Sequence, residues 1–573
     1  MPSQIENIRH SFAHLLAAAV KKLYPGVQFG IGPTIENGFY YDFGDVKIGE
    51  ENLPKIEMEM RKVAKEEHEF RYEEWDAERA KEHFEQENQP YKIELIEELG
   101  NKVGMVHMGD TFLDLCKGGH VEDTTDLPLE AFKLTRIAGA YWRGNEKNPM
   151  LTRVYGVAFN TKKELEEYLE QLEQAEKRDH KKLGKELGLF TFSELVGPGL
   201  PLFTPKGAII RNILKNFVEN LERKYGYQEV WIPHLAKPEL YKTSGHLEKF
   251  KEDLFYVKGY DNDFILKPMN CPHHTQIYKS QMRSYRDLPV RYFETTTVYR
   301  DEQAGELGGL TRVRAITQDD GHCFMREDQI AQEFEINLKI QQELAEKIEL
   351  KEYWIRLSLR DEKNKTAYLG DDATWQKAQE EMEDLLKKQK IEYESREGEA
   401  AFYGPKMDFM AKDSLGRAWQ FSTIQLDFNL PKRFNLEYTA EDGSKKTPVM
   451  MHRAFMGSIE RFMAMLIEHY AGSLPLWLAP EQIWIMPISE KFNTYARNVA
   501  DELGNFRISI KDDNETLGKK IRAGQMQKIP YLIIVGEKEE KSKKISVRQR
   551  EKGDLGLSTV KEFVENVKIE LEN

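Results

Sequence analysis

Residues 290–322, with the sequence VRYFETTTVYRDEQAGELGGLTRVRAITQDDGH, decide the fold of the longest part of this chain. Both ends of the segment are rich in β-branched and aromatic residues, which favour strands, and a glycine-containing loop separates them. Arg300 enters the loop, and Arg312 and Arg314 leave it. Because arginine presents a planar and permanently charged fork to phosphate oxygens, the segment indicates two strands around an anion-binding loop. A solvated charged hairpin is the alternative interpretation.

Further strand-like stretches surround this segment, among them QEVWIP (228–233) and AWQFSTIQLDF (418–428). They do not alternate regularly with helices, so we predict a largely antiparallel sheet within residues 191–476. No GxGxxG follows a strand and no GxxxxGK[ST] occurs. A nucleotide bound here would therefore not lie in a Rossmann or P-loop cradle.

The two ends of the chain have different patterns. In the N-terminal part, FYYDFG (39–44) and VGMVHMGDTFLDL (103–115) predict strands, and the charged residues 51–88 predict helices. Residues 161–190 have leucines at helical spacing on a charged background, which suits a solvated connecting helix. Whether that helix is only a linker or also contacts RNA stays open.

The last hundred residues, 477–573, combine the strands QIWIMPI, FRISIKD, IPYLIIVG and KISVRQR with helical stretches such as FNTYARNVADELG. That pattern predicts a small α/β domain. With 573 residues, the chain has room for about four domains of ordinary size. The predicted fold class is an α+β protein of several domains.

Composition excludes some classes of protein. The chain has no apolar run of membrane-spanning length, and its start, MPSQIENIRHSF, does not resemble a secretory signal. Three cysteines do not make a disulfide framework, so we expect a reducing, cytoplasmic setting without a membrane. The net charge of −14 does not suggest a nucleic-acid binder, but KEEKSKKISVRQREK (538–552) supplies local positive charge.

A metal site is suggested by Cys271 in KPMNCPHH, His322 in TQDDGHCF and His452 in VMMHRAF. One thiolate and two imidazoles form a sensible zinc set with an open fourth position, which is typical of a working site. On spacing alone, His273 and His274 are competing ligands. A buried cysteine that only fills space is the alternative.

Two further patterns attract attention. Arg461 lies in the apolar helical run GSIERFMAML (457–466), so it needs an anion or a carboxylate partner, and Glu460 faces another side of the helix. In the N-terminal part, an HxxxH pattern and a CxxxH pattern have two interpretations: together they bind zinc, or they only pack in the core. They comprise His10, His14, Cys116 and His120.

These stretches resemble a known family. GAIIRNILKNFVENLERKYGYQEVWIP is similar to motif 1 of class II aminoacyl-tRNA synthetases, with a long helix and then a strand ending in Pro233. The segment around Arg300 resembles motif 2, and GSIERF resembles motif 3. KPMNCPHH, RVRAITQDDGH, AAFYGPKMDF, WQFSTIQLDF and MHRAFMGSIERF together are similar to the threonyl-tRNA synthetases. The resemblance covers essentially the whole chain.

The resemblance implies a ligase that activates L-threonine with ATP and Mg²⁺ and transfers it to the 3′ end of tRNA(Thr). Arg300, Arg461 and Lys406 would be catalytic. The ATP-binding residues would be Arg300, Glu302, Arg312, Gln420 and Arg461. The adenine-stacking position of motif 2, often aromatic in the family, is Ile316 here.

The resemblance also implies that Zn²⁺ on Cys271, His322 and His452 reads the amino acid. The threonine pocket would be lined by Met269, Gln318, Asp320, Tyr403 and Gln425. Zinc that binds both the amino group and the hydroxyl would reject valine. Serine differs from threonine by one methyl, worth about 1–3 kcal/mol, so serine would pass and a hydrolytic check is required.

The check is expected in an editing domain, residues 1–160, which resembles the domain shared by threonyl- and alanyl-tRNA synthetases. In the bacterial threonyl version it hydrolyses seryl-tRNA with no required metal. Its residues would be His10, His14, Lys92, Asp114, Cys116 and His120.

The same comparison gives a linker helix at 161–190, a catalytic domain at 191–476 and an anticodon-binding domain at 477–573, and it implies a homodimer. The anticodon would be read by Asn514, Arg522, Glu539 and Arg548. The family's ubiquitin-like domain is expected to be missing, since the sequence starts at the editing helix. Alternatives are a class IIa synthetase for proline, serine or histidine, a catalytically inactive paralogue acting as an RNA-binding regulator, and a free-standing editing factor.

Overall fold

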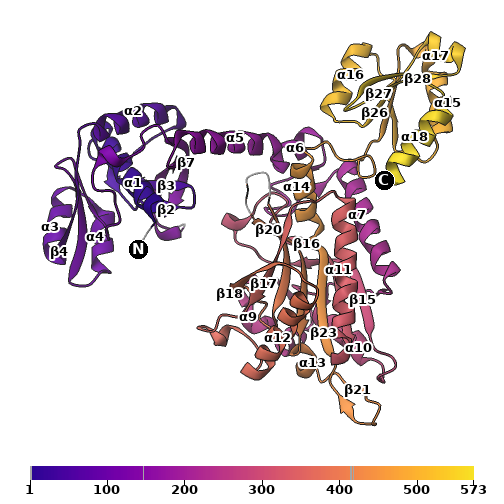
Figure 1. Ribbon diagram of the computed structural model, residues 1–573, viewed down its shortest axis with the longest axis horizontal. Coiled ribbons are helices and arrows are strands. Elements are labelled where there is room, and N and C mark those ends of the chain that lie inside the picture. The colour runs from indigo at the N-terminus through magenta and orange to yellow at the C-terminus, as the bar shows by residue number, and fades with distance from the viewer. Residues whose placement is uncertain (1–2, 45, 146, 413–415, 417, 573) are drawn as a thin grey trace. The chain divides into compact units, whose positions relative to one another are not determined.

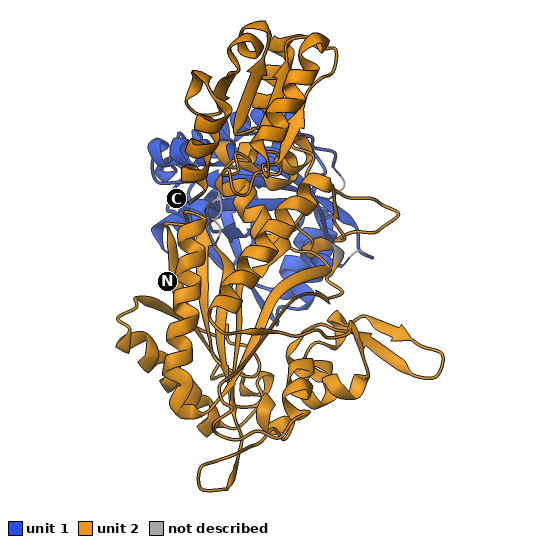
Figure 2. Cartoon of the chain, turned by 90° about the vertical axis from the view of Figure 1, so that its right-hand side faces the viewer, with its two compact units in different colours: residues 1–173 blue, residues 174–573 orange. Residues whose placement is uncertain are grey.

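The computed structural model describes residues 3–44, 46–145, 147–412, 416 and 418–572. The chain forms two compact units, Met1–Glu173 and Gln174–Asn573 (Figure 2). The division falls inside helix α5, Lys162–Arg178. None of the described helices is both long and apolar enough to cross a membrane.

In its described residues, unit 1 contains two antiparallel sheets and four α-helices before α5. In the first sheet the strand order is β1-β3-β8-β7, with β2 beside β3. The strands are β1 (Gln28–Phe29), β2 (Thr34–Ile35), β3 (Gly38–Gly44), β7 (Phe132–Tyr141) and β8 (Met150–Ala158). Helix α1 (Gln4–Leu23) packs its apolar residues onto this sheet together with α2 (Leu53–Ala64), which gives the unit its main core.

The second sheet of unit 1 has the order β4-β5-β6: β4 is Phe70–Asp76, β5 is Lys102–Met108 and β6 is Phe112–Leu115. Helices α3 (Ala77–Gln86) and α4 (Pro90–Glu97) accompany it. The prediction of helices throughout 51–88 is wrong at β4. Pairing of β4 with β5 outweighs the helix preference of its glutamates, and Phe70, Tyr72 and Trp75 suit a strand.

Unit 2 is built on an eight-stranded sheet with the order β11-β15-β16-β23-β20-β19-β17-β18. The strands are β11 (Gln228–Glu229), β15 (Val290–Tyr299), β16 (Ala315–Met325), β17 (Tyr353–Leu359), β18 (Tyr393–Glu397), β19 (Lys406–Lys412), β20 (Ala418–Asp427) and β23 (Val449–Ser458). Only the two edge pairs, β11 with β15 and β17 with β18, are parallel. The predicted antiparallel sheet is therefore confirmed.

Helices cover this sheet and complete the largest core. Along it lie α7 (Pro205–Lys224) and α11 (Ile330–Lys347), as Figure 1 shows. Others are α6 (His180–Glu186), α10 (Cys271–Lys279), α12 (Asp372–Lys388) and α14 (Ile459–His469). The remaining elements of this part are short: β9 (Phe190–Thr191), β10 (Leu202–Phe203), β12 (Leu235–Ala236), α8 (Pro238–Ser244), α9 (His246–Lys249), β13 (Tyr256–Lys258), β14 (Asp263–Leu266), α13 (Leu430–Arg433), β21 (Tyr438–Thr439) and β22 (Lys445–Lys446).

The strand after α7 was predicted to end at Pro233, but it ends earlier, at Glu229. Beyond it, the Val230 amide still donates to the Phe293 carbonyl, but the Ile232 amide donates to the Glu294 side chain. Pro233 has no amide hydrogen to extend the ladder.

The end of the chain, drawn yellow in Figure 1, is a five-stranded sheet with the order β25-β24-β26-β27-β28. Its elements are β24 (Ile483–Pro487), α15 (Asn493–Leu503), β25 (Ile508–Ile510), α16 (Leu517–Met526), β26 (Tyr531–Val535), α17 (Glu537–Ser542), β27 (Ile545–Gln549), β28 (Gly553–Ser558) and α18 (Val560–Glu572). The small α/β domain is as predicted.

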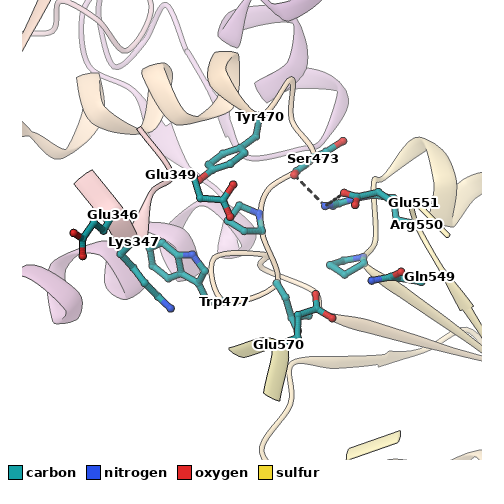
Figure 3. A pocket seen from close by; sticks show the side chains of 13 residues that line it. Glu346, Lys347, Glu349, Tyr470, Ser473, Trp477, Gln549, Arg550, Glu551 and Glu570 are labelled. Atoms are coloured by element: carbon teal, nitrogen blue, oxygen red, sulfur yellow. Dashed lines mark hydrogen bonds and ion pairs between the residues drawn. The ribbon is translucent and has the colours of Figure 1, made fainter. Parts of the chain in front are cut away.

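A hollow of about 300 Å³ lies where the segment after α14 meets this C-terminal sheet. Figure 3 shows the side chains that line it. Arg550 closes one side, since its guanidinium donates to the carbonyl oxygens of Ser473 and Lys528 at 3.1 and 2.8 Å. The ring of Trp477 and the carboxylate of Glu570 line the other sides. None of its lining residues belongs to the predicted sites.

Candidate functional site

Three buried side chains from different elements meet in unit 2. Cys271 begins α10, while His322 and His452 are paired residues on the neighbouring strands β16 and β23. One ligand atom of each lies within 4.8 Å of the others, and the facing nitrogens, His322 Nε2 and His452 Nδ1, are 3.0 Å apart. The antiparallel register of β16 and β23 thus brings His322 and His452, 130 residues apart in the sequence, next to each other.

The imidazoles of His322 and His452 each contact a polar side chain through a second ring nitrogen, as metal-binding histidines commonly do. His452 Nε2 lies 2.9 Å from Asp427 Oδ2, and His322 Nδ1 lies 2.7 Å from His274 Nδ1. Such contacts fix the ring that presents its other nitrogen to a metal. Burial raises the pKa of the Cys271 thiol and lowers the pKa of His322, so a bound cation would have to stabilise the thiolate.

This donor set fits zinc: one sulfur, two nitrogens and space for further ligands. Among the described residues, the groups that could hold an ion here include neither His273 nor His274. His274 instead contacts the back of His322.

The predicted threonine pocket borders the cluster. The Tyr403 ring stacks on His452 with centroids 4.6 Å apart, and its hydroxyl donates to the Gln425 side chain. Asp320 Oδ2 accepts from Asn270 Nδ2 at 3.0 Å, and its other oxygen is 3.8 Å from His322 Nε2. Gln318 Oε1 is buried without a hydrogen-bond partner among the described residues. The pocket therefore offers an acid, amides and a phenol beside the metal set.

Met269 joins this pocket to the arginine site, since Arg300 Nη2 lies 3.0 Å from its sulfur. Burial lowers the pKa of Arg300, and the nearby Arg312 contributes. Burial also lowers the pKa of Arg461, with Arg300 and Arg312 adding to the effect. Several guanidiniums held this close favour a polyanionic ligand.

The loop after β15 is held by its own charges. Arg312 pairs with Glu302 at 2.6 Å and with Glu306 at 3.0 Å. Arg314 donates to the Glu302 carbonyl, and Arg461 Nε donates to the Thr311 carbonyl at 2.9 Å. The contact of Arg461 with Thr311 brings α14 next to the loop that carries Arg312.

Other predicted residues also find neighbours. Lys406 Nζ lies 2.9 Å from Asp408 and 3.4 Å from Gln420 Oε1. Glu460 accepts from Arg211 and from the Thr317 amide, which confirms that it does not pair with Arg461. Ile316 lies on β16 as expected.

In unit 1, His10, His14, Cys116 and His120 offer ligand atoms within 4.8 Å of one another. Cys116 Sγ is 3.5 Å from His10 Nε2 and 3.3 Å from His120 Nε2. Burial raises the pKa of the Cys116 thiol to about 11 and lowers the pKa of His10, His14 and His120. At neutral pH the four groups are therefore uncharged.

An ion pair borders this cluster. Lys92 Nζ contacts Asp114, and it lies 3.1 Å from the Tyr41 hydroxyl, which also donates to Asp114. His14 Nε2 is 4.0 Å from the same carboxylate. Neutral imidazoles beside a buried acid, amine and phenol can position water and move protons.

The predicted anticodon residues lie on the C-terminal domain but on separate elements. Asn514 precedes α16, Arg522 is on α16, Glu539 is on α17 and Arg548 is on β27. Asn514 and Arg522 are exposed, and Glu539 and Arg548 are half-buried. Their joint role stays a prediction.

Sequence reasoning missed three residues of these sites. Tyr41 was interpreted only as part of a strand, Asp427 ended a strand without a role, and His274 was considered only as a ligand. For Asp427 the sequence contains a signal, because this carboxylate stands at the end of a strand in which apolar and polar residues alternate. Its pairing with His452 depends on the register of β20 and β23.

Comparisons with known domains agree with this geometry. Residues 254–470 match the tRNA synthetase class II core domain (G, H, P, S and T), and residues 482–570 match an anticodon binding domain. Residues 103–155 match the second additional domain of threonyl and alanyl tRNA synthetases. The fold is that of a class II aminoacyl-tRNA synthetase.

Whole-chain relatives narrow the class further. The chain is 49% identical to the threonine–tRNA ligase of Gloeobacter violaceus, over 98% of this chain and 91% of that protein. It is 48% identical to that of Cytophaga hutchinsonii, over 98% and 88%. The chain belongs to the threonine–tRNA ligase family.

Solved structures are similar as well. The RNA binding domain of threonyl-tRNA synthetase from Cryptosporidium parvum Iowa II is 37% identical, with a TM-score of 0.65, and the match covers 68% of this chain and 98% of that one. A putative threonyl-tRNA synthetase from Aeropyrum pernix is 28% identical, with a TM-score of 0.60, over 69% and 95%.

Proposed function

We propose that this chain joins L-threonine to ATP, forming threonyl-adenylate and diphosphate, and then transfers threonine to the 3′ end of tRNA(Thr). One observation carries the proposal: the Cys271, His322 and His452 cluster borders a polar pocket that Met269 links to Arg300. Amino-acid recognition and phosphate binding thus meet at one place.

The arginines would supply the activation step. Arg300 would bind the α-phosphate as the threonine carboxylate attacks it, with pyrophosphate leaving on the opposite side. Arg461 and Arg312 would hold the other phosphates, together with the Mg²⁺ that accompanies ATP. Lys406 and Gln420 would complete the polar wall of this site. Catalysis of this kind is positioning plus stabilisation of developing charge, and no side chain becomes a nucleophile.

Specificity would come from the Cys/His cluster. Zinc, when bound to it, supplies open positions for an amino group and a hydroxyl. Asp320 would accept hydrogen bonds from the amino group, and Tyr403 and Gln425 would bound the side chain. Valine has no hydroxyl and is excluded, whereas serine keeps both groups and is only one methyl smaller.

Serine would therefore reach the tRNA, and the cluster in unit 1 is proposed to remove it. There, His10, His14, Cys116 and His120 would hold the seryl ester and a water, with Lys92 and Asp114 orienting them. The neutral thiol argues against a thiolate nucleophile, so we propose direct attack by water.

One assay tests the synthetic function against its rivals: ATP–pyrophosphate exchange with threonine, serine, valine and proline, before and after a zinc chelator. Exchange strongest with threonine, weaker with serine, absent with valine and lost on chelation is expected. Exchange strongest with proline, or none with threonine in zinc-loaded protein, would reject the proposal. The second result would favour an inactive RNA-binding paralogue.

We further propose a homodimer formed around α7 and the segment that follows it. The Trp231 side chain there is 76% exposed, and a large aromatic left in water is typical of an interface residue. Sedimentation should give twice the chain mass, and Trp231→Glu should shift the protein toward monomer. A wild-type protein of single chain mass at micromolar concentration would contradict this.

A further inference from the structure

A buried histidine outside the predicted sites contacts the ATP-binding loop. His180 is the first residue of α6 and only 3% exposed. Its Nε2 accepts a hydrogen bond from the Leu310 amide at 3.1 Å, and its Nδ1 donates to Glu468 Oε1 at 2.7 Å. Leu310 belongs to the loop between β15 and β16, and Glu468 is the penultimate residue of α14. One ring thus bridges the two elements that carry Arg312 and Arg461.

The hydrogen bonds define the state of the ring. A nitrogen that accepts from an amide carries no proton, so His180 is the neutral tautomer with its proton on Nδ1. Asp179, His180 and Glu468 lie close enough to hold an ion, but both ring nitrogens are engaged. The Asp179 carboxylate accepts from the Lys181 amide as the cap of α6. The cluster is therefore a hydrogen-bonded bridge and not a metal site.

The loop is shaped to approach this ring. Gly309 has φ +60°, and a Cβ added there would lie 2.4 Å from His180 Nε2. Leu310 is fully buried, and the next carbonyl, Thr311, accepts from Arg461 Nε at 2.9 Å. Hence the loop is held on one side by His180 and on the other by Arg461.

We propose that His180 is a positioning residue for adenylate formation, which holds the Gly308–Arg312 loop in the conformation that binds ATP. This inference rests on the proposed function. It concerns ATP and not threonine, because the bridge contacts the loop and α14 but none of the residues of the Cys/His cluster.

Two substitutions separate the two hydrogen bonds. In His180→Gln, the amide oxygen can occupy the place of Nε2 and accept from Leu310. In His180→Asn, the shorter amide can replace only Nδ1 and keep the bond to Glu468. In His180→Asn the buried Leu310 amide has no acceptor. The KM for ATP in ATP–pyrophosphate exchange should therefore rise by about tenfold, with the KM for threonine unchanged. His180→Gln should stay within about threefold of wild type.

Controls distinguish this from general destabilisation. His469→Asn, at an exposed position of the same helix α14, should leave both KM values unchanged. Zinc content and seryl-tRNA deacylation should be normal in all three variants. If wild type shows no threonine-dependent exchange, the proposed function fails. If wild type is active but the Asn and Gln variants have equal KM values for ATP, changed or not, the role of His180 is rejected.

A second variant tests the loop without altering His180. Gly309→Ala should raise the KM for ATP, because its methyl group meets the ring and its φ is strained. Combining it with His180→Ala removes the closest clash and leaves only the flexible Lys181 side chain near the new methyl group. The double variant should therefore lose less than the product of the two single effects. If the effects of Gly309→Ala and His180→Ala on the KM for ATP simply multiply in the double variant, the proposed direct contact is contradicted. This test also stands if His180→Asn does not fold.

Discussion

Among the residues that the structure describes, each unit has one cluster of cysteine and histidine, fully buried in unit 2 and mostly half-buried in unit 1. The two clusters differ in what lies behind the imidazoles. In unit 2, the carboxylate of Asp427 lies behind His452 and His274 lies behind His322. In unit 1, the hydroxyl of Ser11 lies 3.3 Å from His120 Nδ1. The Asp114 carboxylate, 4.0 Å from His14, is already paired with Lys92, and burial, His10 and Lys92 all lower the pKa of His14.

The difference teaches that residue type is a weak guide to metal binding. A carboxylate behind an imidazole raises its basicity and favours a cation in front of it. A nearby ammonium has the opposite effect. The first cluster therefore suits zinc, and the second suits neutral groups that position water. Each prediction below tests one side of this contrast.

The largest effect is expected for Cys271→Ala. Loss of the sulfur ligand should remove zinc and lower threonine-dependent exchange by roughly a thousandfold, while seryl-tRNA deacylation is unchanged. Zinc analysis and exchange kinetics check this. Cys323→Ala, at the other buried cysteine of unit 2, is the matched control and should retain zinc. Retention of zinc by Cys271→Ala would remove the basis of the contrast.

On the other side, Cys116→Ala and His14→Ala should slow seryl-tRNA deacylation by about a hundredfold and leave exchange near normal. Deacylation of preformed seryl-tRNA measures the loss, and accumulation of seryl-tRNA in a charging reaction provides the second readout. Normal deacylation by both variants would show that this cluster does not edit.

A more modest effect is expected from the groups behind the rings. Asp427→Asn should weaken zinc binding about 10–100-fold, because the amide keeps the shape but not the charge. Competition with a chelator of known affinity measures it. Ser11→Ala in unit 1 should slow deacylation only severalfold, through loss of one neutral hydrogen bond. Equal zinc affinity of Asp427→Asn and wild type would mean that the carboxylate is not what distinguishes the clusters.

The last prediction concerns the pH dependence of one thiol and involves no substitution. With a pKa of about 11, Cys116 is about one part in a thousand thiolate at pH 8. The rate of its alkylation by iodoacetamide should therefore be low at pH 8. The rate should rise about tenfold with each unit of increasing pH until the pH approaches 11. Mass spectrometry of the labelled peptide follows this. A rate that is already maximal at pH 8 would indicate a thiolate and reopen the question of a metal or a cysteine nucleophile.

Much of the fold could be predicted from periodicity. The antiparallel sheet and the C-terminal α/β domain follow from strands whose side chains alternate or are continuously apolar. The strand β4 could not be predicted in this way, because FRYEEWD is charged and becomes a strand only by pairing with β5. Similarly, residues 161–190 contain two helices that meet at Asp179, which caps the second one.

The site was predictable where a motif is contiguous and not where it depends on register. Arg300, Arg461 and the three Cys/His residues stand in recognisable stretches. Asp427 supports His452 only because β20 and β23 pair, and Tyr41 reaches Asp114 only because separate sheets come together. His180 lies in a charged helical region that resembles a linker, and nothing local indicates that it contacts a loop 130 residues away.

The position of His180 has a practical consequence for dissecting the protein. A catalytic fragment designed to start at residue 191 would omit Leu183, Leu187 and Leu189, which belong to the main core of unit 2, as well as the histidine. Such a fragment would lose activity for reasons unrelated to editing, and the loss could be mistaken for communication between the two activities. A fragment that starts within α5, near residue 174, retains α6 and is the proper starting point for separating them.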